Sequence, residues 1–170
     1  MSLRKTATRP NARFGGCERE HMHAKNKNHL TLLTSIKPIQ GWEEYLEDGN
    51  GYLRTAKGGY ANRKKIFTST ILYNIIAMAI EKFVMAALMR HGTLPYNHTM
   101  ADLVESMEET FPGSLAGIRE GLLRLDSYQD ICDPYEFTIV ELAMDEIPGM
   151  LDLAGKLQQL VIKNDLANEA

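Results

Sequence analysis

Apolar residues recur at helical spacing along most of the chain, and one stretch is apolar on nearly every side. The stretch runs from about Ile66 to Arg90, in a helix expected to begin near Tyr60. One face of it holds Ile66, Tyr73, Ala77, Ile80, Val84 and Leu88. A helix that is apolar nearly all round is buried on more than one side. This pattern predicts the central helix of a bundle, or a helix with one face against a second subunit, ended by Gly92.

Four further helices are predicted around this central one. The first is expected over roughly residues 39–55, with Pro38 in its first turn, with Gly49 and Gly51 weakening its middle and with Gly58-Gly59 ending it. Thr99 is expected to cap the next helix, which should end before Pro112. The pattern is typical of an all-α, up-and-down bundle of about five helices.

The last two helices are expected after a proline-glycine break. One should run roughly from Ser114 to Gln129, and the other from the Asp133-Pro134 start signal to about Lys163. Pro148 would kink or split that final helix. Residues 30–36 fit either a short strand or a lead-in to a helix, and their pattern does not decide between the two.

Charge separates the chain into two regions. Residues 1–29 carry seven Lys or Arg and two Glu, for a net +5, whereas residues 30–170 carry 12 basic and 20 acidic residues, for a net −8. Low apolar content makes residues 1–29 a basic arm expected to be disordered, ahead of a helical domain spanning 30–170. Cys17 and Cys132 make no disulfide framework, which favours a cytoplasmic protein.

The run from Ile71 to Met89 is long enough to cross a bilayer. Glu81 and Lys82 lie at its middle, where charges are costly in lipid. We therefore expect a buried helix and no membrane association.

The order of several short motifs resembles a HEPN domain (higher eukaryotes and prokaryotes nucleotide-binding). The first motif is Trp42 and Tyr45 on a first helix, and the second is the apolar helix from Ile71 to Leu88 with Glu81-Lys82 inside it. The third is Gly92, Pro95 and His98 before Asp102-Leu103, and the fourth is Asp133-Pro134 at the start of a long last helix. The likeness covers about residues 42–162. It implies a protein that binds a nucleotide or nucleic acid such as RNA, or that partners a separately encoded nucleotidyltransferase. A homodimer is expected because the central helix has more apolar surface than one bundle face needs.

The ribonucleases of that family carry an Arg followed four to six residues later by a His. No His follows Arg124 in the matching region, residues 124–137, so the resemblance implies a non-catalytic member with no cofactor. Two alternatives stay open. One is a HEPN-type ribonuclease, toxin-like, with a displaced site that uses Arg90 and His98. The other is a structural or regulatory interaction module whose basic arm docks on an acidic partner.

Seven residues are candidates for binding a nucleotide or nucleic acid. They are Arg63, Lys64, Lys65, Glu81, Arg90, His91 and His98. The first three are cations at a helix start, where the helix dipole does not favour them. Arg90 and His91 follow the apolar helix, where cations are ordinary. A carboxylate in so apolar a stretch as Glu81 needs a partner.

A metal site is not expected. Cys17, His21, His23 and His29 are all zinc-ligating residue types, but their spacing lacks the two tight pairs of a closed zinc site.

Overall fold

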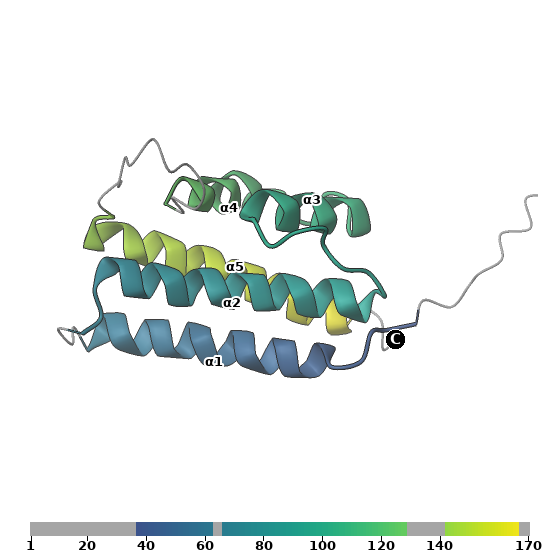
Figure 1. Ribbon diagram of the computed structural model, residues 1–170, viewed down its shortest axis with the longest axis horizontal. Helices are drawn as coiled ribbons and strands as arrows, with labels where there is room; N and C mark the ends of the chain where they lie inside the picture. The colour runs from purple at the N-terminus through teal and green to yellow at the C-terminus, as the bar shows by residue number, and fades with distance from the viewer. Residues whose placement is uncertain (1–36, 63–65, 129–141, 167–170) are drawn as a thin grey trace, which may run out of the picture. The chain divides into compact units, whose positions relative to one another are not determined.

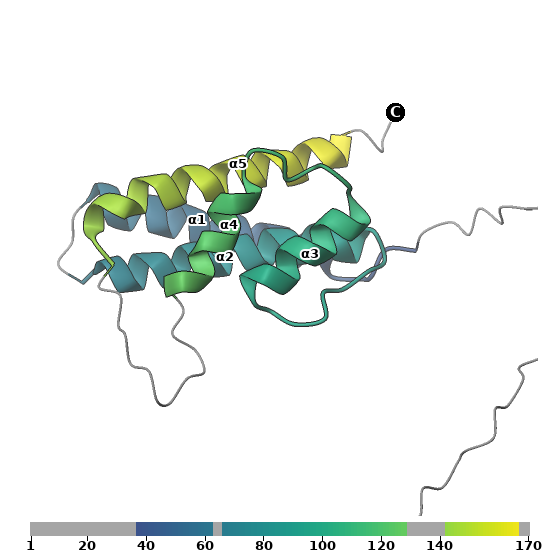
Figure 2. The same cartoon turned by 90° about the horizontal axis from the view of Figure 1, so that it is seen from above.

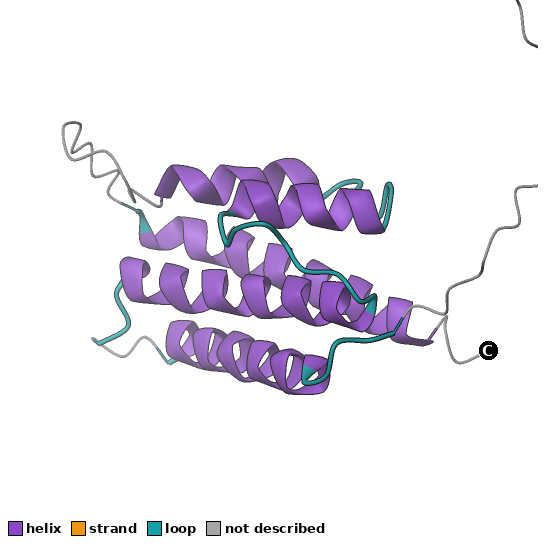
Figure 3. Ribbon diagram, turned by 45° about the vertical axis from the view of Figure 1, so that its right-hand side comes forward, coloured by secondary structure: helices purple, strands orange, loops and turns teal. Residues whose placement is uncertain are grey.

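The computed structural model describes residues 37–62, 66–128 and 142–166, all within one unit, Ser35–Ala170. Within these ranges the chain forms five α-helices and two 3-10 helices and no strand (Figure 3). They are α1 (Trp42–Ala61), α2 (Ser69–Arg90), α3 (Met100–Thr110), α4 (Arg119–Arg124), η1 (Leu125–Tyr128), η2 (Met144–Glu146) and α5 (Ile147–Leu166). The predicted all-α bundle is confirmed. Residues 30–36 lie outside the described ranges.

The three long helices α1, α2 and α5 lie side by side, and α3 and α4 lie on the side of α2 away from α1 (Figure 1). α2 contacts α1, α3 and α5, and thirteen of its 22 residues are buried. Its largest fully buried side chains face the other helices: Leu72, Ile76, Ile80, Phe83 and Leu88. Seen from above, α4 crosses the bundle between α2 and α5 (Figure 2).

Helix α1 differs from its prediction at both ends. It begins at Trp42 rather than at residue 39, because Gly41 before it has a left-handed backbone with φ +89°. It also continues through Gly58-Gly59 to Ala61. Gly59 is buried against the ring of Phe67, so this glycine provides close packing and does not end the helix.

Helix α2 begins at Ser69, later than expected, because the Thr68 hydroxyl accepts a hydrogen bond from Ile71 N at 3.2 Å. Its predicted end is confirmed: His91 caps it and Gly92 follows with φ +72°. α2 is long and apolar enough to cross a membrane, but 67% of its most apolar window is buried inside the protein. Buried core helices have the same property.

The remaining helices follow the prediction in part. Thr99 caps α3 by accepting from Asp102 N at 3.1 Å, as expected. α4 starts only at Arg119, because Gly113 and Gly117 hold left-handed turns with φ +77° and +88°. α5 begins at Ile147, so Pro148 occupies its first turn, where a proline breaks no helical hydrogen bond. Pro148 therefore causes no kink within α5, and the predicted start at Asp133 lies outside the described residues, so the predicted split of a longer helix stays a prediction.

Candidate functional site

One side of α2 is exposed between α1 and α3. Ile71, Asn74 and Met78 are spaced three and four residues apart, which places them on one helix face. Ile71 is 43% exposed and Met78 40% exposed, and Asn74 between them is exposed as well. Ile75 beside them is half-buried. We call Ile71, Asn74, Ile75 and Met78 the α2 face.

A paired carboxylate and imidazole lie one turn beyond this face. His98 Nδ1 is 2.8 Å from Glu81 Oε1, which joins α2 to the residue just before the α3 cap. The side chains are 63% and 34% exposed, respectively, so solvent reaches both. The sequence predicted that Glu81 needs a partner, and the structure places His98 there.

The neighbouring charge on α2 points to α1 instead. Lys82 Nζ is 3.3 Å from Asp48 Oδ2 and lies 4.1 Å from the centroid of the Tyr45 ring. An ammonium over an aromatic face is attracted by the negative charge of the ring face. The two adjacent charges of α2 are therefore held by different neighbours, Glu81 on the α3 side and Lys82 on the α1 side.

Arg90 and His91 make aromatic contacts. The Arg90 guanidinium carbon lies 5.0 Å from the centroid of the Trp42 ring, and the His91 ring meets the Phe111 ring edge-on at 4.8 Å. Arg90 follows Glu81 by nine residues, roughly two and a half helical turns. The two side chains therefore leave α2 on opposite sides. Of the candidate residues, the structure brings together Glu81 and His98 and separates Arg90 from them.

Arg63, Lys64 and Lys65 lie outside the described residues, as do Cys17 and the three histidines near it. Within the described ranges, no three His, Cys, Asp or Glu side chains cluster closely enough to hold a metal ion. The nucleotide- or nucleic-acid-binding role predicted for Arg63, Lys64 and Lys65 stays a prediction.

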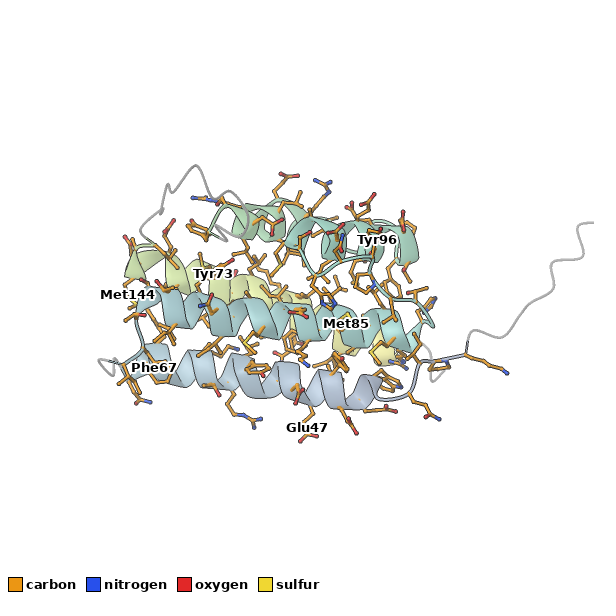
Figure 4. The ribbon with its side chains drawn as sticks, in the orientation of Figure 1. Glu47, Phe67, Tyr73, Met85, Tyr96 and Met144 are labelled. Atoms are coloured by element: carbon orange, nitrogen blue, oxygen red, sulfur yellow. The ribbon has the colours of Figure 1, made fainter. Side chains whose placement is uncertain are left out.

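Exposed apolar side chains gather in and around α2, which the sequence pattern alone did not show. Leu94 and Tyr96, in the loop after α2, are 55% and 92% exposed. Figure 4 shows Tyr96 in that loop, on the α3 side of α2. The spacing that marked α2 as apolar could not show which of its faces would stay uncovered.

Comparisons of the chain with protein-family models, with curated proteins and with solved structures find no match.

Proposed function

We propose that this chain is a non-catalytic, HEPN-like binding protein that works as a homodimer, with a nucleotide or nucleic acid as its ligand. The observation that carries the proposal is the α2 face, where Ile71 and Met78 are exposed on either side of Asn74. Exposed apolar surface of this kind marks interaction sites. The proposed ligand rests on the resemblance of the sequence to HEPN domains, and the proposed cytoplasmic location rests on the low cysteine content.

A second copy fits the α2 face by symmetry. In a two-fold dimer the same patch meets itself, so residue i contacts residue j and j contacts i. An antiparallel pairing centred between Asn74 and Ile75 sets Ile71 of one copy against Met78 of the other. Asn74 would then lie near the axis, where a buried amide can specify register. Glu81 and Lys82 would fall at the rim of the contact, where charges stay solvated.

Light scattering at micromolar concentration tests the dimer. We expect a mass near twice the 19.2 kDa of one chain, and Met78→Glu should reduce it to that of a monomer. The matched control is Met144→Glu, because Met144 is 44% exposed and lies on η2 rather than on α2. A monomeric wild-type chain would contradict the homodimer and leave a separately encoded nucleotidyltransferase as the alternative occupant of the face.

The absence of catalysis has its own test. The displaced-site alternative requires Arg90 and His98 to act together, and in the structure these side chains contact different residues, Trp42 and Glu81. We expect purified wild-type protein and His98→Ala to leave labelled RNA equally intact. RNA cleavage by the wild type that is lost in His98→Ala would establish the ribonuclease instead.

A further inference from the structure

A groove runs beside α5 and is separate from the α2 face. Its volume is about 910 Å³. Two residues of α1, one residue of the turn before α4 and eight residues of α5 line it: Lys57, Tyr60, Ser114, Pro148, Leu151, Asp152, Gly155, Lys156, Gln159, Leu160 and Lys163. Figure 2 shows α5 extending along the bundle with α1 below it. The groove is therefore elongated and follows a helix.

The charged side chains of the groove are mostly positive. Three lysines, Lys57, Lys156 and Lys163, face one acid, Asp152. Lys156 Nζ lies 2.7 Å from Asp152 Oδ2, an exposed pair of the kind that contributes little stability. Lys57 and Lys163 form no ion pair with any residue in the described ranges. Two ammonium groups are thus available to an anion.

The lysines are spread along the groove. Lys156 and Lys163 are seven residues apart on α5, which places them on the same side of the helix and separates them by roughly 10 Å. Lys57 enters from α1. A single phosphate would draw its donors to one point. Cations strung along a groove instead match a backbone with repeating phosphates.

Uncharged groups between the lysines add stacking and hydrogen-bonding capacity. Tyr60 is a half-buried ring at the groove wall, and Gln159 is an exposed amide. The Ser114 hydroxyl is shielded from water and has no hydrogen-bond partner among the described residues.

We propose that this groove binds the phosphate backbone of a single-stranded nucleic acid. Lys57, Lys156 and Lys163 contact successive phosphates, and the exposed part of the Tyr60 ring contacts a base, an arrangement common to single-strand grooves. The inference rests on the nucleic-acid binding in the proposed function, and it assigns that binding to a particular groove. A second groove, on the α3–α4 side, is a poorer match for phosphates, because Glu105, Glu108 and Glu109 make it acidic.

Fluorescence anisotropy with a labelled twelve-nucleotide oligouridylate tests the inference on the full chain. Each lysine-to-alanine change should weaken binding about fivefold at 0.1 M salt, because one single-strand phosphate contact contributes about 0.7 to the salt slope. Lys156→Ala with Lys163→Ala should lower that slope by about 1.4. Arg119→Ala is the matched control: it removes one positive charge from the acidic α3–α4 side and should leave affinity unchanged.

The outcomes separate the groove from the general function. Oligouridylate binding that survives unchanged in the double lysine variant overturns the groove and leaves the proposed ligand standing, with the basic arm as its site. If ATP binds as tightly as the oligonucleotide and its binding depends equally on the lysines, the groove is a mononucleotide site. The proposal that it binds a single-stranded nucleic acid is then wrong. If the wild type binds neither, the ligand half of the proposed function fails as well.

Discussion

Helices α1 and α2 meet through apolar side chains over most of their length, whereas the α3–α4 pair adds polar links to a smaller apolar contact. Between α1 and α2, Gly49 brings the backbone of α1 against the buried Phe83 ring. Between α3 and η1, which directly follows α4, the Asp126 carboxylate accepts from Met100 N and Ala101 N, both at 3.0 Å. The first contact depends on volume and the second on a hydrogen-bond acceptor.

This difference predicts which substitutions each contact tolerates. Closely packed apolar surfaces are destabilised by a larger side chain, because the interior has no space for the added atoms. A helix N-terminus instead needs hydrogen-bond acceptors for its first amide hydrogens, and the size of the side chain that supplies them matters less. α3 has such acceptors for three consecutive amides, two from Asp126 and one from Thr99.

The largest effect is expected from a pair of glycines on α1. A Cβ added at Gly49 would lie 2.8 Å from two carbons of the Phe83 ring, whereas a Cβ at Gly51 would meet nothing within 4 Å. We expect Gly49→Ala to cost about 1–3 kcal/mol through overpacking, and Gly51→Ala to gain up to about 1 kcal/mol from helix propensity. Urea unfolding of both variants measures the difference.

One result would contradict the expected cost at Gly49. If both variants gain stability, Phe83 moves freely and the close approach at Gly49 does not limit packing. Gly49→Ala in a Phe83→Leu background sharpens the point, because the smaller side chain should remove most of the cost. Coupling of this kind between contacting residues is what a double-mutant cycle measures.

A smaller effect is expected at the polar end of α3. Asp126→Ala leaves the amides of Met100 and Ala101 without their acceptors, and we expect a loss of about 1–2 kcal/mol. Amide hydrogen exchange should accelerate at those two positions first. Asp145→Ala, an exposed acid on η2, is the control and should change neither stability nor exchange. Unchanged exchange at residues 100 and 101 would show that Asp126 is not the cap.

The sequence predicted the local features of these contacts and missed the distant ones. Thr99 as a cap and Gly92 as a helix end were predictable, because such signals lie within a few residues of the helix in the sequence. The Asp126 cap comes from 25 to 26 residues away, and no local pattern indicates it. Gly49 was interpreted as a weak point of its helix, because spacing alone cannot show that Phe83 packs there.

The candidate site divides in the same way. Glu81 was identified as a carboxylate in need of a partner, and His98 as a separate candidate, but their pairing depends on how the loop before α3 returns to α2. The lysine groove was missed because its cations come from two helices about a hundred residues apart in the chain. Sequence spacing indicates the faces of single helices, whereas this groove lies between α5 and residues of α1.

The smallest effect concerns a polar link between η1 and η2. The Tyr128 hydroxyl donates to Glu146 Oε1 at 2.7 Å, and this hydrogen bond, with partial burial, raises the pKa of Tyr128 above its usual value. The folded protein therefore holds that proton more tightly than the unfolded chain does. The resulting stabilisation is complete below the unfolded tyrosine pKa, about 10, and is lost as pH rises through the folded pKa.

Absorbance of ionised tyrosine across an alkaline titration measures this shift. Subtracting the Tyr128→Phe curve from the wild-type curve isolates one hydroxyl, and its midpoint should lie above the ordinary tyrosine pKa of about 10. Glu146→Gln should lower the midpoint, because an amide oxygen is a weaker acceptor than a carboxylate. A Tyr128 midpoint equal to the ordinary tyrosine pKa would mean that the hydrogen bond from Tyr128 to Glu146 does not persist in solution.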